Sequence, residues 1–319
     1  MRTIFVDEAA KIAREDDRVV FLMSECGFSV TEHFEEEFPD RFYNTGIAEQ
    51  SLVGTAAGIA LRGLRPIAYN MAMFLTMRAY EQIRVDVCCQ NLPVILAGVG
   101  PGLSYGAAGT THHSIEDVAI MRVLPNLTIV FPACELDVRQ SVRQAMALGS
   151  PCYIGLSRAP RQLTVPYSAD MFQIGKAIRM TEGTDAAVFA YGSMIPAAID
   201  AACLLKKDGI ALRVYNMHTI KPLDTEAIDE AARNCGVIFS LEEENIIGGL
   251  GGAIAEYVAE KDLVQCRFRR LGVPDVYLDK AGSYSWLLTQ FDLDAGGVAD
   301  TVKKVLWKTD MPPHRNTGN

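Results

Sequence analysis

The chain has 319 residues, of which 49% are apolar and 22% charged, and its formal net charge is -9. This length suggests two domains of ordinary size, and the acidic balance excludes a nucleic-acid or anionic-membrane surface. No apolar run approaches a membrane span, and the acids among the first ten residues are not those of a signal peptide. Eight cysteines without a C-x-x-C pair favour reduced thiols in the cytoplasm.

In the first half of the chain, short apolar runs alternate with segments of helical spacing. The run "RVVFLMS" (18–24) predicts a buried strand, and "LPVILAGVG" (92–100) predicts another that ends in a glycine-rich loop. Between them, "FLTMRAYEQIRVDVC" (74–88) has apolar residues at helical spacing and predicts a helix. Strands that alternate with helices predict a parallel sheet covered on both faces.

One carboxylate in this half stands out. Glu49 follows the apolar pair Ile47 and Ala48 and precedes a segment, 51–63, that is rich in Gly and Ala and predicts a helix with a small-residue face. Acids are rarely buried without a partner, because burial disfavours the charged form. Glu49 is therefore either an acid that the helix dipole favours or a group that a reaction requires.

The loop after the strand at 92–100 is a second candidate region. It reads "GVGPGLSYGAAGTTHHS" (98–114) and ends in His112 and His113. Long loops at the carboxyl ends of parallel strands are where ligands bind. One of the two histidines is interpreted as capping a helix, but both together favour a site, and Ser114 is predicted to cap the helix that follows.

The second half of the chain predicts another α/β unit. Residues 161–184 collect prolines and polar residues and predict a linker plus a bridging strand. Strand and helix patterns alternate again from about residue 185 to residue 310. The glycines of "GGLGG" (248–252) lack the third glycine of a dinucleotide fingerprint, so we interpret them as close helix packing. The fold class is thus α/β, with two parallel or mixed sheets.

Several of these segments together resemble one group of enzymes. The resemblance lies in "YNTGIAEQSLVGTAAGIALRG", "FLTMRAYEQIRVDV", "GTTHHSIEDVAIMRVLPN", "HTIKPLD" and "EEENIIGGLGGAIAE". They are similar to the second half of transketolases and of 1-deoxy-xylulose-5-phosphate synthases, both dependent on thiamine diphosphate, and extend to about residue 300. The resemblance implies a pyrimidine-binding domain at 1–160 and a transketolase C-terminal domain at 185–310.

The resemblance also implies roles for residues around the cofactor. Glu49 matches the glutamate that shares a proton with N1′ of the thiamine pyrimidine, a role that suits an apolar pocket. Phe74 matches the aromatic side chain that stacks on the pyrimidine. Met77 stands where many transketolases carry a second Phe, and Tyr80 matches a tyrosine near the cofactor.

Three further residues are implied as contacts to the substrate. Arg78 resembles an arginine of the synthases, and Arg158 an arginine of both families, that bind the sugar phosphate. His112 matches a histidine that stabilises the developing alkoxide or moves its proton. Ala108 stands where transketolases carry an Asp that binds a substrate hydroxyl, which predicts a substrate pair other than the standard one.

A motif that transketolases carry in their first half has no counterpart here. It is a G-D-G segment followed by an Asn, which bind Mg²⁺ and the diphosphate, and we expect no metal ligand on this chain. The resemblance therefore implies the smaller subunit of a split transketolase, with Mg²⁺ held mainly by an N-terminal partner subunit in an α2β2 assembly. It implies transfer of a two-carbon ketol unit from an anionic ketose to an aldose.

Three alternatives stay open at this point. One is a decarboxylating ligase of the deoxyxylulose-phosphate type, which uses pyruvate. Another is the beta subunit of a 2-oxoacid dehydrogenase. The third is a non-catalytic regulatory or scaffold subunit, against which the presence of Glu49 and Phe74 argues.

Overall fold

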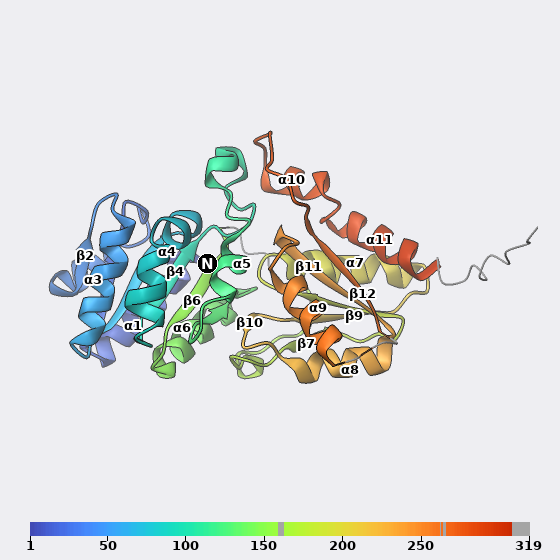
Figure 1. Cartoon of the computed structure of the whole chain (residues 1–319), viewed down its shortest axis with the longest axis horizontal. Helices are drawn as coiled ribbons and strands as arrows, with labels where there is room; N and C mark the ends of the chain where they lie inside the picture. Colours follow the sequence, from blue (N-terminus) through green and yellow to red (C-terminus); the bar gives the residue numbers. More distant parts are fainter. Residues whose placement is uncertain (159–162, 262, 264–265, 308–319) are drawn as a thin grey trace, which may run out of the picture.

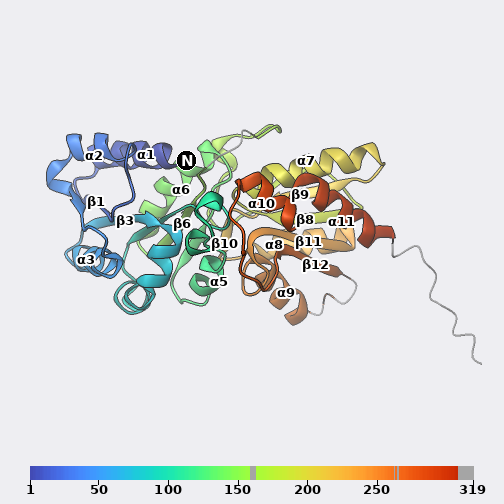
Figure 2. The same cartoon turned by 90° about the horizontal axis from the view of Figure 1, so that it is seen from above.

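The computed structural model describes residues 1–158, 163–261, 263 and 266–307. These residues form two α/β domains that lie side by side (Figures 1 and 2). The α/β fold class is confirmed. The outer ends of the predicted linker and of the predicted second domain, at residues 161 and 310, lie outside the described residues.

The first domain is built on a seven-stranded sheet in the order β10-β5-β6-β4-β3-β1-β2. All neighbouring strands are parallel except β10 and β5, which are antiparallel. The strands in chain order are β1 (Val19–Met23), β2 (Phe42–Asn44), β3 (Arg65–Met71), β4 (Ile95–Val99), β5 (Thr128–Val130), β6 (Cys152–Leu156) and β10 (Thr219–Lys221). The central strands β1, β4 and β6 are buried along their whole length, as the continuous apolar runs predict.

Helices cover both faces of this sheet. On one face α1 (Arg2–Glu15) and α6 (Glu135–Leu148) pack around Phe5, Phe21 and Tyr69. On the other face α3 (Glu49–Leu61) and α5 (Asp117–Arg122) enclose a core that includes Leu52, Leu22 and Leu96. The short elements α2 (Glu32–Glu37), η1 (Pro39–Arg41), η4 (Gly106–Ala108) and η5 (Thr110–His112) lie in loops.

The helix predicted at 74–88 is irregular in the structure. It consists of two π-helical segments, η2 (Phe74–Arg78) and η3 (Ile83–Cys88), around the single turn α4 (Tyr80–Gln82). Its buried side chains, among them Leu75 and Ile83, still face the core as the spacing predicts. Widened turns of this kind are rare and concentrate at functional sites, because they shift side chains out of the regular helical register.

The second domain has a five-stranded sheet in the order β12-β11-β8-β9-β7, in which only β7 is antiparallel to its neighbour. Its strands are β7 (Ile178–Thr181), β8 (Ala186–Ala190), β9 (Leu212–Asn216), β11 (Val237–Asn245) and β12 (Arg267–Val273). Its helices are α7 (Met194–Lys207), α8 (Thr225–Cys235), α9 (Leu250–Glu260), α10 (Tyr284–Gln290) and α11 (Ala295–Trp307), and the short η6 (Ala169–Met171) precedes β7. β7 is the strand expected near the end of the linker.

The two domains are joined by more than the linker. The segment β10 follows β9 of the second sheet, yet it pairs with β5 and becomes the edge strand of the first sheet. Both large apolar cores contain residues of both domains, for example Ile154 with Val188, and Tyr153 with Phe189. The domains therefore share a continuous packed interior, which a linker alone would not provide.

Two sequence predictions about loops can be compared with the structure. Ser114 was predicted to cap the following helix, and this is wrong: α5 begins at Asp117 and has no side-chain cap. Ser114 instead forms an isolated antiparallel bridge with Gly102. The packing role of the glycines at 248–252 is confirmed, since a Cβ on Gly249 would come within 2.0 Å of Glu242, and one on Gly251 within 2.5 Å of Ser240.

Buried acids gather where β11 meets the first domain. Glu242, Glu243 and Glu244 are consecutive on β11 and each is at most 2% exposed, as is Asp117 of α5. Burial raises the pKa of Glu242 and of Glu243 to about 7, and it also raises the pKa values of Glu244 and Asp117. The interior at this junction therefore favours protonated carboxyl groups near neutral pH.

This burial predicts how stability depends on pH. A carboxyl whose pKa is raised by folding stabilises the fold below its unfolded pKa, and loses that contribution as the pH rises through the folded pKa. Gln at position 243 does not titrate, so Glu243→Gln should gain stability relative to the wild type by roughly 1–3 kcal/mol between pH 5 and pH 8. Urea unfolding at both pH values would measure this, and a difference that does not change with pH would contradict it.

Candidate active site

The candidate site lies at the carboxyl edge of the first sheet. Glu49 follows β2, Phe74 follows β3, His112 lies in the loop after β4, and Arg158 follows β6. Because parallel strands end at the same edge, four segments far apart in the sequence deliver these side chains to one place. The sequence-predicted residues thus share an edge of the sheet, and their contacts form a connected series.

Glu49 is the first residue of α3 and is 5% exposed. Its Oε1 accepts a hydrogen bond of 3.3 Å from Asn70 Nδ2, and its Oε2 lies 3.7 Å from Arg78 Nη1. Asn70 is itself held, because its Oδ1 accepts from the amide of Met71. Glu49 thus has the dipole-favoured helix position and also a polar pocket, so the two interpretations of this residue are compatible.

Phe74 links this carboxylate to the glycine-rich loop. The Arg78 guanidinium carbon lies 4.9 Å from the centre of the Phe74 ring, and the His112 ring meets the Phe74 ring edge-on at 5.5 Å. His112 Nδ1 lies 2.9 Å from Thr111 Oγ1. None of the hydrogen bonds among the described residues uses His112 Nε2, so this atom can exchange a proton with a ligand.

The series continues to the arginine after β6. The ring centre of Tyr105 lies 6.4 Å from that of His112, and the Arg158 guanidinium carbon lies 4.4 Å from the Tyr105 ring. Glu49, Arg78, Phe74, His112, Tyr105 and Arg158 therefore follow one another in contact along the edge of the sheet. We call these six residues the edge series. Five of them were predicted from the sequence, and Tyr105 was not.

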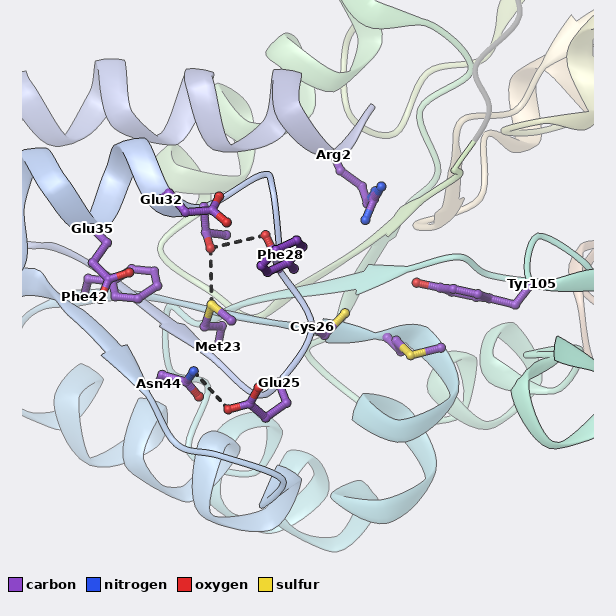
Figure 3. Close-up of a pocket in the computed structure, with 13 residues that line it drawn as sticks. Arg2, Met23, Glu25, Cys26, Phe28, Glu32, Glu35, Phe42, Asn44 and Tyr105 are labelled. Carbon is purple, nitrogen blue, oxygen red and sulfur yellow. Dashed lines mark hydrogen bonds between the residues drawn. The ribbon is translucent and has the colours of Figure 1, made fainter. Parts of the chain in front are cut away.

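A cavity of about 390 Å³ adjoins the Tyr105 end of this series (Figure 3). Arg2, Cys26 and Tyr105 lie toward one end of it, and Glu32 and Phe42 toward the other. The remaining lining residues include Met23, Glu25, Phe28, Glu35, Asn44 and Met71. The cavity thus opens beside the series rather than inside either domain.

Two cations influence the thiol and the phenol of this cavity. Burial raises the pKa of Cys26 to about 11, while the charges of Arg2 and Arg158 act in the opposite direction. Burial raises the pKa of Tyr105 as well, against the same two arginines. Both groups are therefore neutral at physiological pH, and the uncompensated positive charge nearby suits an anion.

The other predicted residues lie around this centre. Met77 is 37% exposed on the same π-helical segment as Phe74, and the Tyr80 hydroxyl donates to the carbonyl of Ile120 at 2.8 Å. Ala108 is exposed on η4. His113 is buried with Nε2 3.4 Å from the Gly106 carbonyl, and burial lowers its pKa, so it does not cap a helix as one interpretation had it.

Sequence reasoning missed three residues here. Asn70 ends the predicted strand "RPIAYN", where a polar residue at a strand's carboxyl end could have been noticed. Tyr105 is the single aromatic residue of the glycine-rich loop, which is a usable signal. Arg2 gives none, because it reaches the site through the placement of α1, far from the other residues in sequence.

Among the described residues, no group of three or more His, Cys, Asp or Glu side chains is arranged to hold a metal ion. Nor does any helix in the described ranges have the length and hydropathy to cross a membrane.

Comparison with known proteins agrees with this site. The model "Transketolase, pyrimidine binding domain" matches residues 1–163, and "Transketolase, C-terminal domain" matches residues 175–298. The chain belongs to the transketolase family. It is 34% identical to an apulose-4-phosphate transketolase subunit of Phocaeicola vulgatus, over 96% of this chain and 97% of that protein.

Two other comparisons show the extent of this transketolase-family chain. It is 36% identical to 1-deoxy-D-xylulose-5-phosphate synthase 1 of Geobacter sulfurreducens over 97% of this chain, but spans only 48% of that protein. A solved structure described as a split gene transketolase, inactive beta4 tetramer, superposes with a TM-score of 0.85 at 36% identity, covering 96% of this chain and 98% of the other. The chain therefore has the extent of a split subunit and about half that of the synthase.

The contact between Asn70 and Glu49 yields a testable prediction. Asn70→Ala removes the donor to a buried carboxylate, and we expect this to destabilise the isolated chain by about 1–3 kcal/mol. Asn234→Ala is the matched control, because the Asn234 side chain donates only to the exposed carbonyl of Glu230. Equal unfolding free energies for the two variants in urea would contradict the role assigned to Asn70.

Proposed function

We propose that this chain is the pyrimidine-binding subunit of a split transketolase, which transfers a two-carbon ketol unit from an anionic ketose to an aldose. The observation that carries the proposal is the edge series, which begins at the buried Glu49 and ends at Arg158 beside a cavity. It combines an acid, an aromatic face, a histidine and cations. The chain's extent, equal to that of the split-subunit relatives, supports the same conclusion.

The residues near Glu49 fit the aminopyrimidine of thiamine diphosphate. A buried carboxyl with one oxygen fixed by Asn70 suits proton sharing with a ring nitrogen, and Phe74 offers a ring for stacking. Met77 and Tyr80, on the same irregular helical stretch, are the proposed further contacts to the cofactor. When bound, the cofactor supplies the nucleophilic carbon that attacks the ketose carbonyl.

His112 is the proposed group for the oxygen of the reacting carbonyl. If Thr111 donates to Nδ1, the proton of the neutral ring is on Nε2, where it can be donated to an oxygen that gains negative charge. The edge-on contact with Phe74 fixes the ring beside the cofactor-binding face. His112 thus stabilises the alkoxide, or returns a proton to it, without a change in its own position.

The substrate's anionic group is assigned to the arginines. Arg158 is exposed over Tyr105, and Arg2 lies on the other side of Cys26 in the cavity. Arg78 lies at the Glu49 end and is more than half exposed, so it remains a proposed contact to phosphate. Ala108 offers no hydrogen bond to a substrate hydroxyl, which supports an acceptor or donor other than the standard pair.

The proposal assigns Mg²⁺ and the diphosphate group to an N-terminal transketolase subunit, in an α2β2 heterotetramer. Its support is the absence of a G-D-G motif in the sequence and of a metal-binding cluster among the described residues. A cytoplasmic location belongs to the same proposal. The eight free thiols, of which Cys89 and Cys203 are exposed, support a reducing compartment.

A second candidate is a decarboxylating ligase of the deoxyxylulose-phosphate type. It is supported by the identity to the Geobacter sulfurreducens synthase, which is similar to the identity to the Phocaeicola vulgatus transketolase subunit. The two functions differ in the donor, pyruvate or a ketose, and the assay below separates them.

The role of Glu49 predicts the result of a single substitution. Glu49→Gln keeps the shape of the side chain but cannot share a proton in the same way, so turnover by the assembled complex should fall by about 10²–10⁴-fold. Steady-state kinetics would measure it, and size-exclusion chromatography would verify that the variant still assembles. Near-normal turnover in an intact complex would refute the role of Glu49.

The function itself is tested by co-purifying the chain with a subunit that carries G-D-G and its Asn. We expect the complex, but not the isolated chain, to bind thiamine diphosphate with micromolar affinity in calorimetry and to use a ketose. The donors are xylulose 5-phosphate, fructose 6-phosphate, apulose 4-phosphate, 6-deoxy-6-sulfofructose and pyruvate. Release of CO2 from pyruvate would favour the decarboxylating ligase, and micromolar binding by the isolated chain would refute the split-subunit proposal.

A further inference from the structure

The loop that carries His112 belongs to the first domain, but it is held by the second. The amide of Leu103 donates to Glu243 Oε2 at 3.1 Å, and the amide of Gly282 donates to the carbonyl of Gly106 at 3.2 Å. Thr110 Oγ1 also donates to the carbonyl of Leu278. Figure 1 shows the loop with η4 and η5 standing beside the segment that leads into α10.

Glu243 differs from its two neighbours in what it contacts. Glu242 accepts from the amides of Leu250 and Gly251 at 2.8 and 2.9 Å, and Glu244 accepts from the Tyr191 hydroxyl, all within the second domain. Side chains alternate along a strand, so Glu243 points away from both. Among the described residues, its carboxylate is the one of the three that bonds to the first domain.

The base of the loop is packed closely against this carboxylate. Gly102 and Ser114 exchange backbone hydrogen bonds of 3.0 and 2.9 Å and so close the loop two residues beyond His112. Gly102 has a φ of 58°, and a Cβ built on it would lie 2.4 Å from Glu243 Cγ. The other oxygen of Glu243 accepts from Ser193, which fixes the carboxylate from its own domain.

A fully buried carboxyl is an expensive way to fill this space. An apolar side chain of similar volume would avoid the desolvation cost, so the acid indicates that its acceptor atoms are needed. The amide of Leu103 is itself buried, and without Glu243 it would lose its partner. The contact thus satisfies a loop donor that no other described residue pairs.

We propose that Glu243 is a positioning residue, which fixes the base of the loop at 100–114 through the Leu103 amide and thereby holds His112 against Phe74. The catalytic part of this inference rests on the proposed function of His112, whereas the anchoring part does not. The second domain supplies none of the predicted site residues, and this contact gives it a part in the reaction.

Amide hydrogen exchange of the isolated chain tests the anchoring without any ligand. In Glu243→Ala, exchange of Leu103 and of peptides within 100–114 should accelerate by about 10- to 100-fold, the scale of one hydrogen bond to a charged group. Glu243→Gln keeps an acceptor for the amide and should restore most of the protection. Unchanged exchange in Glu243→Ala would overturn the inference.

Glu242→Ala is the matched control, since it removes an equally buried carboxylate of the same strand. It should accelerate exchange at the start of α9, where Leu250 and Gly251 lose their acceptor, and leave 100–114 protected. If Glu242→Ala loosened the loop as much as Glu243→Ala, the effect would be general destabilisation, and the inference would fail. If Glu243→Ala does not fold, Gly102→Ala perturbs the same contact from the loop side and should accelerate exchange in 100–114.

Kinetics of the complex with its partner subunit test the catalytic part, with whichever of the five donors above is turned over fastest. Glu243→Ala should lower kcat by about tenfold, as expected for a displaced catalytic group, with little change in KM. In the His112→Ala background the same substitution should cost less than twofold. An equal loss in both backgrounds would show that Glu243 does not act through His112. If His112→Ala alone left kcat unchanged, the role of His112 would fail, while the exchange result would stand.

Discussion

Parallel pairing of the strands in the first sheet is the constraint on which the site depends. Because β1, β2, β3, β4 and β6 run in one direction, the segments that follow them all begin at the same edge. Glu49, Phe74, His112 and Arg158 come from four such segments, and their contacts with Arg78 and Tyr105 complete the edge series. One backbone arrangement thus brings together an acid, a ring face, a proton-exchanging group and two cations.

Buried charge separates the two uses that the fold makes of acids. Glu49 is buried at the edge with Asn70 and Arg78 as partners, in reach of a ligand. Glu242, Glu243 and Glu244 are buried at the junction of the domains, bonded to backbone amides and hydroxyls. Each costs desolvation that its hydrogen bonds offset, so these positions mark where geometry matters more than stability.

The junction also explains why two domains are needed to present one site. The strand β10 extends the first sheet, the apolar cores run across both domains, and the His112 loop is bonded to the segments around Glu243 and Leu278. A glycine-rich loop alone would sample many conformations, and these contacts offset the entropy that is lost when it is fixed. The second domain therefore acts as a rigid support for the loop.

The sequence by itself determined the alternation of strands and helices, the two α/β units and most of the edge series. Apolar runs and their spacing encode burial locally, and the motifs around Glu49, Phe74, His112 and Arg158 lie within short segments. It did not determine the π-helical turns at Phe74–Arg78 and Ile83–Cys88, because their spacing of apolar residues resembles that of a regular helix. Nor did it determine the pairing of β10 with the first sheet, the place of Arg2, or the bond from Glu243 to Leu103. Those contacts join residues more than a hundred positions apart or on different elements, and only the packed tertiary structure decides which of them meet.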